Sequence, residues 1–240
     1  MSFPKTRHSV LLGLRSDDAG ERRLAGESLV GAYWRPVYAY LRLRWKARPE
    51  DAEDLTQGFF ARALEKGYFD RYDQARARFR TFLRTCLDAY VQNERQAATR
   101  LKRGGGAVVL GLDFQTAEGD LVAREIPDGT DLDALFQREW VRALFADALA
   151  ELRRRCEARG KPAAFALFER YDVIGEDAGA RPTYEELARE HALPVTQVTN
   201  HLHWARREFR AAVLETLRAA TASEQEFRAE AREILGVDPE

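Results

Sequence analysis

Apolar residues recur every three or four positions along most of the chain, which is the spacing of helices with one buried face. Alternation of apolar and polar residues, the pattern of a strand, extends over several positions only in the run AVVLGLDF at residues 107–114. The pattern therefore predicts an all-α protein. The expected helices cover residues 20–46, 49–67, 79–103, 132–159, 163–171, 183–193, 195–217 and 224–235.

Residues with special backbone preferences mark several of the expected helix ends. Pro36 stands inside the first helix, where it should produce a kink or mark the start. Gly67 is a suitable residue to end the second helix. Asp131 or Asp133 can cap the helix that follows them. Residues 183–186 read TYEE, the spacing of a capping box, and predict a helix start at that point.

The length of 240 residues allows one large domain or two small ones. Charged residues make up 32%, but the formal net charge is only -1, which excludes a uniformly basic coat for nucleic acid and leaves local patches open. Cys86 and Cys156 form no paired motif, which fits a reducing compartment. Since no apolar run approaches the ~18 residues of a membrane span, we expect a cytoplasmic protein.

The charges are sorted along the chain into neighbouring basic and acidic blocks. Residues 71–103 carry a net charge of +6, and residues 104–133 carry a net charge of -6. A basic helical stretch with interspersed aromatic residues can bind phosphates and stack on bases. The acidic block has the glycines of a linker and can instead lie in a basic channel of a partner. The alternative is that both blocks are merely solvated surfaces.

A second feature is a predicted helix-turn-helix. A capped short helix from Thr183, a turn near Ala192 and a second helix from Val195 have the required lengths. Apolar residues would hold the two helices together, whereas polar ones would project from the second helix toward a DNA groove. The alternative is an ordinary helical hairpin. The inward residues are Ala188, Leu193, Val198 and Leu202; the outward ones are Thr196, Gln197, Thr199, Asn200, His203, Arg206 and Arg207.

Four carboxylates crowd the beginning of the second helix: Glu50, Asp51, Glu53 and Asp54. Such a density can hold Mg²⁺ or Ca²⁺, but no second group of ligands supports a metal site. Acids at a helix N-terminus also compensate the helix dipole. A third interpretation is a docking surface for a basic partner helix.

Several of these segments resemble sigma-70 family RNA polymerase sigma factors of the extracytoplasmic-function type. Residues 49–64 (PEDAEDLTQGFFARAL) resemble region 2.2, and residues 69–83 (FDRYDQARARFRTFL) resemble region 2.3. Residues 87–106 (LDAYVQNERQAATRLKRGGG) are similar to region 2.4, and the helix-turn-helix over residues 184–207 is similar to region 4.2.

The resemblance implies a division of the chain into two helical domains. Residues 1–103 would form a region 2-like domain, and residues 132–220 a region 4-like domain. Residues 104–131 would be an acidic flexible linker that runs toward the active-site cleft and RNA exit path of the polymerase. Residues 221–240 would be an acidic C-terminal helix or tail.

The resemblance also assigns partners to the candidate residues. Region 2.2 would bind the β′ clamp of core RNA polymerase, region 4 would bind the β flap and the minus-thirty-five element, and region 2 would bind the minus-ten element of promoter DNA. The polymerase-binding residues would be Glu50, Asp51, Glu53, Asp54 and Gln57. The minus-ten residues would be Tyr72, Arg76, Arg78, Arg80, Asn93, Arg100, Lys102 and Arg103. The minus-thirty-five residues would be the outward set of the helix-turn-helix.

Such a protein would need no cofactor, metal or catalytic residue, and would not be an enzyme. Its sub-group is often associated with a Ser/Thr kinase rather than an anti-sigma factor, and Thr56 is one candidate phosphorylation site. Ala89 and Asn93 depart from the residues usual in region 2.4. His201, His203 and Trp204 are less basic than the residues usual in the recognition helix. The two alternatives to a sigma factor are a metal-dependent helical hydrolase and a stand-alone helix-turn-helix transcriptional regulator.

The segment from Thr221 to Glu240 is acidic and follows a basic recognition helix with Arg206, Arg207 and Arg210. It predicts either an inhibitory cover over the DNA-reading face or a helix that completes the core of the second domain.

Overall fold

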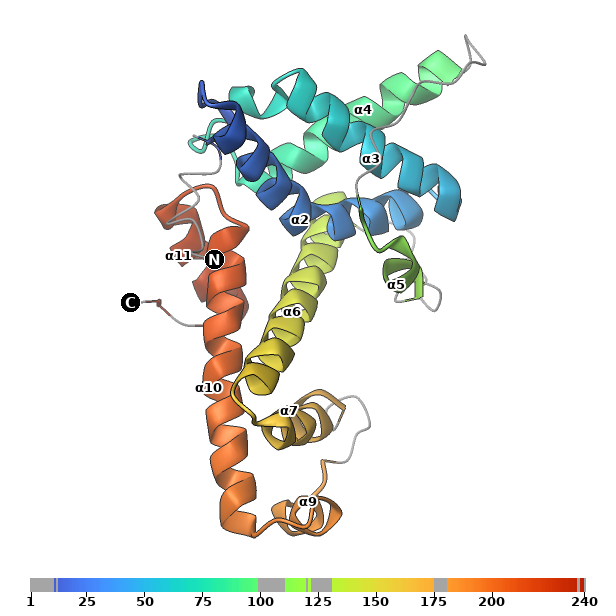
Figure 1. Cartoon of the computed structure of the whole chain (residues 1–240). Coiled ribbons are helices and arrows are strands. Elements are labelled where there is room, and N and C mark those ends of the chain that lie inside the picture. The colour runs from blue at the N-terminus through green and yellow to red at the C-terminus, as the bar shows by residue number, and fades with distance from the viewer. Residues whose placement is uncertain are drawn as a thin grey trace. The chain divides into compact units, whose positions relative to one another are not determined.

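The computed structural model describes residues 11, 13–98, 111–119, 121, 131–174, 181–236, 238 and 239. Over these residues the chain is all-α and contains no strand, which confirms the predicted fold class. It divides into two compact units: unit 1 comprises Met1–Ala143 and Leu217–Glu240, and unit 2 comprises Leu144–Thr216 (Figure 1). Each unit is described by itself below.

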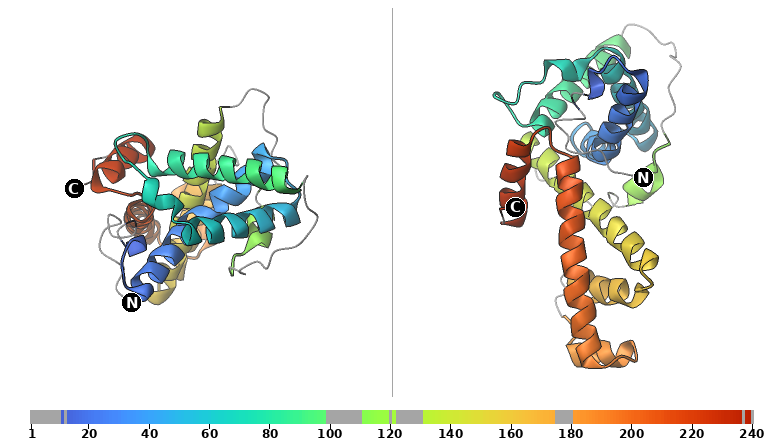
Figure 2. Two further views of the ribbon diagram at one scale, coloured as in Figure 1. Left: turned by 90° about the horizontal axis from the view of Figure 1, so that it is seen from above. Right: turned by 60° about the vertical axis from the view of Figure 1, so that its left-hand side comes forward.

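The core of unit 1 lies among its three longest helices, whose packing is visible from above in Figure 2. They are α2 (Ala19–Arg44), α3 (Pro49–Glu65) and α4 (Phe79–Ala98). Unit 1 also contains η1 (Tyr68–Arg71), α5 (Phe114–Gly119), the first part of α6 (Leu132–Ala158) and α11 (Glu224–Leu235). Large side chains without measurable exposure fill this core: Tyr38, Tyr40, Leu41, Phe59, Phe60, Leu83 and Leu87.

The helix ends of unit 1 follow the signals in the sequence, with one correction. Pro36 does not mark a helix start, because α2 begins at Ala19, where the Asp18 side chain accepts the Glu21 N–H, and continues past the proline. Gly67 adopts φ 60° directly after α3, as expected of a glycine at a helix end. Leu24 stands at the helical spacing of the apolar residues in α2, yet it is 60% exposed.

The segment predicted as a flexible linker contains a docked helix. Within α5, Phe114 is buried between Trp34 and Tyr38 of α2, at ring centroid distances of 5.4 and 5.1 Å. Glu118 of the same helix pairs with Arg42. At least this part of the segment is therefore fixed to α2. At the next helix start, the Asp131 carboxylate accepts the N–H of Asp133 at 3.1 Å, so Asp131 is the capping residue of α6.

Unit 2 consists of the remainder of α6, α7 (Pro162–Phe168), the π-helical turn η2 (Glu169–Val173), α9 (Tyr184–Glu190) and most of α10 (Val195–Ala219). The capping box predicted at Thr183 and Glu186 is present. Ala192, in the turn between α9 and α10, has φ 52°, the conformation for which glycine is the usual residue. Its position confirms the tight turn that the helix-turn-helix requires.

Candidate nucleic-acid interface

The helix-turn-helix in unit 2 has the inward contacts predicted for it. Leu187, Ala188, Val198 and Leu202 form one buried cluster with Leu167 of α7, and Leu193 packs against it. Because these residues fix the orientation of α10, the opposite face of that helix is presented to solvent. The exposed side chains on it are the predicted outward set: Thr196, Gln197, Thr199, Asn200, His203, Arg206 and Arg207.

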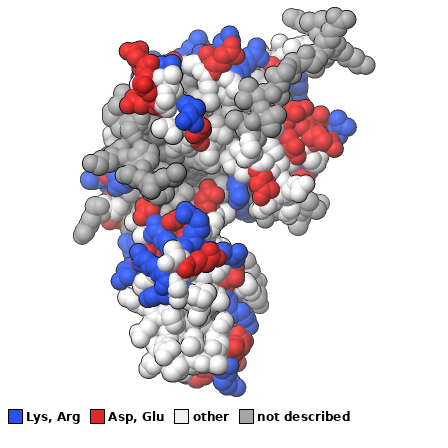
Figure 3. All heavy atoms as spheres, in the orientation of Figure 1, with Lys and Arg blue, Asp and Glu red and all other residues white. Residues whose placement is uncertain are grey.

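Arg206 differs from the rest of this set because it already has a partner inside unit 2. Its Nε and Nη2 atoms each lie 3.0 Å from a carboxylate oxygen of Asp172, and its guanidinium lies over the Tyr171 ring. These hydrogen bonds raise the pKa of Arg206 above its ordinary value. Arg207 is the more exposed of the two arginines, and its nearest acid is the adjacent Glu208 at 3.4 Å. The end of unit 2 that carries α9 and the beginning of α10 is mainly uncharged on the face in Figure 3.

The acidic beginning of α3 is a surface of unit 1. Glu50, Asp51 and Asp54 are exposed, and Glu53 and Gln57 are partly buried. Asp51 accepts a hydrogen bond from Arg48 Nε at 2.9 Å, and this contact lowers the pKa of the Asp51 carboxyl. Glu50 and Asp54 therefore present the least engaged carboxylates of this surface among the contacts of the described chain.

The suggestion that Thr56 is phosphorylated is wrong for the folded protein. Thr56 lies on the inner face of α3 with no exposed area, and its hydroxyl donates to the carbonyl oxygen of Ala52 at 2.7 Å. Spacing along the helix explains the error, because Thr56 falls on the same face as Ala52, Phe59 and Phe60. A kinase would have no access to this hydroxyl without local unfolding.

The predicted minus-ten residues of unit 1 lie on the loop before α4 and on α4 itself. Tyr72 is half-buried and packs edge-on against Phe79 and at a tilt against Phe82, at 5.1 and 5.4 Å. Arg76 is exposed and pairs with Asp73 at 3.2 Å. Asn93 is exposed further along α4. Arg100, Lys102 and Arg103 lie outside the described residues.

Arg78 and Arg80, the two remaining minus-ten residues, face the acids of α11. Arg78 Nη1 lies 3.2 Å from Glu230 Oε1 and 2.5 Å from Glu233 Oε2. Arg80 forms an ion pair with Glu230, and its Nη2 lies 3.8 Å from Glu233 Oε1. We call the segment from Tyr72 to Arg80, which ends with the first two residues of α4, the basic loop. In this structure α11 covers its end.

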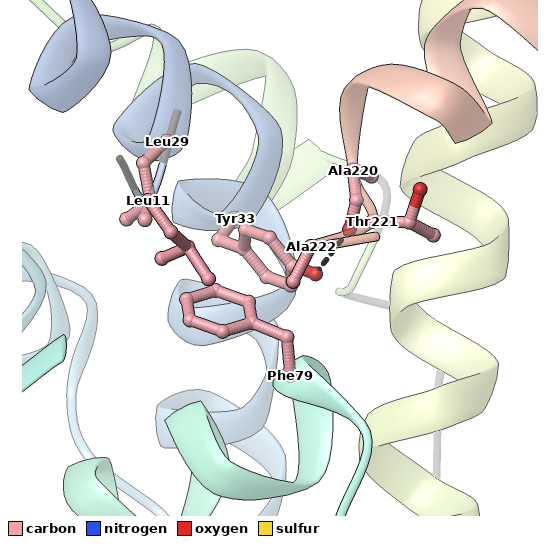
Figure 4. A pocket seen from close by; sticks show the side chains of 7 residues that line it. All are labelled: Leu11, Leu29, Tyr33, Phe79, Ala220, Thr221 and Ala222. Atoms are coloured by element: carbon pink, nitrogen blue, oxygen red, sulfur yellow. Dashed lines mark hydrogen bonds between the residues drawn. The ribbon is translucent and has the colours of Figure 1, made fainter. Parts of the chain in front are cut away.

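The backbone of the basic loop takes part in the same contact. The N–H of Phe79 donates to Glu226 Oε1 at 2.8 Å, and the N–H of Ala222 donates to Glu226 Oε2 at 2.8 Å. Burial raises the pKa of the Glu226 carboxyl, and these two hydrogen bonds oppose the change. Just before α11, the Tyr33 hydroxyl donates to the Ala220 carbonyl at 2.5 Å, beside Leu29 and Phe79 (Figure 4).

Both hypotheses for the acidic segment after residue 220 placed it on the second domain, whereas the structure assigns this segment to unit 1. The helix itself runs from Glu224 to Leu235, as predicted. Its contacts, however, are with the basic loop, the beginning of α6 and Arg218 at the end of α10, all within unit 1. Sequence reasoning assigned the segment to the domain nearest in sequence. The sequence did carry a signal for a basic partner, because the spacing of Glu226, Glu230 and Glu233 puts three acids on one helix face.

The described part of the chain offers no cluster of three or more His, Cys, Asp or Glu residues suited to a metal ion. Within the same residues, no helix combines the length and apolar character needed to cross a membrane. The features that the described residues do present are an acidic helix start, a basic loop with aromatic residues, and a helix-turn-helix.

These features indicate a class of protein: a helical protein that binds nucleic acid through a helix-turn-helix and a basic loop with aromatic residues. The comparison with protein families is more specific. Residues 29–101 match the model of the family described as Sigma-70 region 2. This match supports a sigma-70 family sigma factor, a DNA-binding protein of transcription initiation. Curated proteins and solved structures gave no significant match.

Proposed function

We propose that this protein is a sigma factor that binds core RNA polymerase and directs promoter recognition, DNA melting and transcription initiation. The observation that carries the proposal is the family match over residues 29–101, which covers α3, the basic loop and the described part of α4. Proteins of this family act on DNA through core polymerase and are not enzymes themselves. The place of action that follows is the cytoplasm.

Unit 1 would supply the polymerase contact and the minus-ten contact. The carboxylates at the beginning of α3 complement a basic helix of the β′ clamp, because Glu50 and Asp54 are exposed and point away from the core. The basic loop brings Arg76 and Arg78 next to Tyr72, a combination that suits the backbone and bases of a single strand. Capture of an unstacked base costs a few kcal/mol, which these contacts would offset.

Unit 2 would supply the minus-thirty-five contact. Its helix-turn-helix presents Gln197 and Asn200, whose amides can read base edges, and Arg207, which can contact phosphate. The β flap is the polymerase partner that the resemblance gives to this unit. The extracytoplasmic-function type and control by a Ser/Thr kinase or an anti-sigma factor belong to the same proposal. They rest on the sequence motifs alone.

The decisive experiment is transcription in vitro with purified core RNA polymerase on promoters selected from random DNA. We expect the protein to form a holoenzyme and to start transcripts at a fixed distance downstream of a common two-part element. Core enzyme alone is the control. Sequence-specific binding to duplex DNA without any affinity for core polymerase would contradict the proposal and would indicate a stand-alone helix-turn-helix regulator.

A further inference from the structure

The contact between α11 and the basic loop pairs a row of acids with the arginines assigned to DNA. Residues four and three positions apart lie on one face of a helix, roughly 5–6 Å from neighbour to neighbour. Glu226, Glu230 and Glu233 form such a row, and each one bonds to the stretch from Arg78 to Arg80. A sugar–phosphate backbone presents the same feature, a line of anionic oxygens at regular spacing.

We propose that α11 is an internal competitor for single-stranded DNA: its three carboxylates occupy the basic loop, and α11 leaves the loop when promoter DNA binds there. The inference rests on the proposed function, because it takes the basic loop as the minus-ten site. The occupant is a segment of this same chain, and the displacing partner is a single strand of DNA.

The graded burial across this contact favours displacement that begins at one edge. At the outer edge, the side chains of Arg78 and Glu233 are each 39% exposed, so their pair is open to solvent and to a competing phosphate. Further in, Arg80 and Glu230 are 7% and 1% exposed. A strand that engages Arg78 first would weaken the hold of Glu233 before the inner pair separates.

The fit between α11 and the loop is also incomplete. A hollow of about 160 Å³ lies between them, lined on one side by Tyr72, Gln74 and Arg78 and on the other by Ser223, Glu226 and Ala229. The only large apolar side chain that α11 buries is Phe227, with Ala231 beside it. Charge pairing therefore carries much of this contact, and a polyanion competes directly with charge pairing.

The competing explanation is that α11 is a permanent part of the core of unit 1. The two explanations predict different changes in DNA affinity when the charge pairs are weakened. A competitor that is weakened frees the arginines, so DNA affinity rises. A core element that is weakened disturbs the loop, so DNA affinity falls or stays the same.

The test measures binding of a fluorescein-labelled thymidine homopolymer strand to the full-length chain by fluorescence anisotropy. Glu233→Gln removes the outer pair. We expect affinity for the strand to rise about threefold, which corresponds to the interaction free energy of a partly exposed ion pair. Glu230→Gln removes the inner pair, and we expect a rise of more than about tenfold. The matched control is Glu224→Gln on the same helix, which pairs with Arg218 and Arg228 and not with the loop. It should bind as the wild type does.

Hydrogen exchange supplies a second readout that a permanent core helix would not give. We expect the amides of α11 to lose protection when holoenzyme opens a promoter, while those of α3 keep it. Unchanged protection of α11 in the open complex would overturn the proposal. So would equal strand affinity of the Glu233→Gln, Glu230→Gln and Glu224→Gln proteins.

The transcription assay separates failure of this proposal from failure of the proposed function. If the wild-type holoenzyme initiates transcription but the Glu233→Gln and Glu224→Gln proteins bind the strand equally, only the role of α11 is refuted. If no variant binds the strand and core polymerase is never engaged, the sigma-factor function fails and the role of α11 fails with it.

Discussion

The guanidinium of Arg80 and the carboxylate of Glu230 form an ion pair that is almost completely buried, with 7% and 1% of these residues exposed. The Trp140 ring of α6 lies against the same guanidinium, 5.2 Å from its centroid to the Arg80 Cζ atom. Burial is the main cause that lowers the pKa of Arg80, which marks the cost of keeping its charge inside unit 1. The pair is therefore sensitive to loss of either partner.

Replacing Arg80 alone should destabilise unit 1 strongly. Arg80→Met leaves the Glu230 carboxylate buried without its partner, and we expect a loss of about 3–5 kcal/mol in the free energy of unfolding. The double variant Arg80→Met, Glu230→Leu should recover most of that loss, because it leaves no buried charge without a partner. Urea unfolding followed by circular dichroism measures both. A single variant as stable as the wild type would refute this reading of the pair.

The turn of the helix-turn-helix should be improved by glycine. Ala192 has φ 52°, a left-handed conformation that costs a residue with Cβ about 1 kcal/mol. Ala192→Gly should therefore stabilise unit 2 by up to that amount and raise its melting temperature. Ala188→Gly is the matched control: Ala188 lies in α9 and is buried, so the same exchange should destabilise by roughly 1 kcal/mol. Destabilisation by both would show that the turn is not strained.

The docking of α5 on α2 should depend on pH in the acid range. The hydrogen bonds from Arg42, together with that from Tyr38, hold the pKa of Glu118 below its ordinary value of 4.5. A lowered folded-state pKa contributes stability above 4.5, and this contribution is lost as pH falls through the lowered value. Glu118→Gln should cost about 2 kcal/mol at neutral pH.

The difference in stability between wild type and Glu118→Gln should shrink as pH falls below 4.5. Chemical unfolding at a series of pH values measures it, with Glu27→Gln, which removes an exposed pair with Arg23, as the control variant. A constant difference over the whole series would contradict the assignment of the acid-sensitive contribution to Glu118.

The acids at the beginning of α3 should act in binding rather than in folding. Glu50→Ala combined with Asp54→Ala should weaken affinity for core polymerase at least tenfold, since both are exposed. The melting temperature should change little, because no described contact in unit 1 depends on them. Glu65→Ala, an exposed acid at the other end of α3, is the control for loss of charge. Normal core affinity in the double variant would exclude this surface.

The exposed residues of α10 should fall into three kinds when their variants are measured for binding to upstream promoter DNA and for stability. Asn200→Ala or Gln197→Ala should cost roughly 1–3 kcal/mol and relax specificity at one base pair. Arg207→Ala should weaken binding to all sequences and lower the salt dependence. Arg206→Ala should instead destabilise unit 2, because Asp172 loses its partner. Identical sequence profiles for Asn200→Ala and Arg207→Ala would refute the distinction.

Local features of the fold could be predicted because local spacing determines them. The helix at Glu224–Leu235 was expected with the same bounds, and the capping box at Thr183 lies where its spacing requires. The helix-turn-helix contacts of Val198 and Leu202 follow from the same periodicity. These elements depend on side chains only a few residues apart, which a pattern along the chain records directly.

Pairings between distant segments could not be predicted in the same way. Nothing near Glu230 in the sequence indicates that Arg80 is its partner, because many acids and arginines are available in this charge-rich chain. The basic loop was recognised as a candidate DNA site, yet its cover was not. Nor does helical spacing alone show that Leu24 is exposed, since that depends on which helices pack against α2.

Unit 1 is built from two stretches of sequence that are separated by the whole of unit 2. During translation the ribosome therefore produces residues 144–216 before α11 exists, and domains generally fold as they emerge. Until then the nascent first stretch carries Arg78 and Arg80 without their acids, close to ribosomal RNA, itself a polyanion. A chain that terminates before residue 217 would lack α11. Its basic surface would stay exposed until the incomplete chain is degraded.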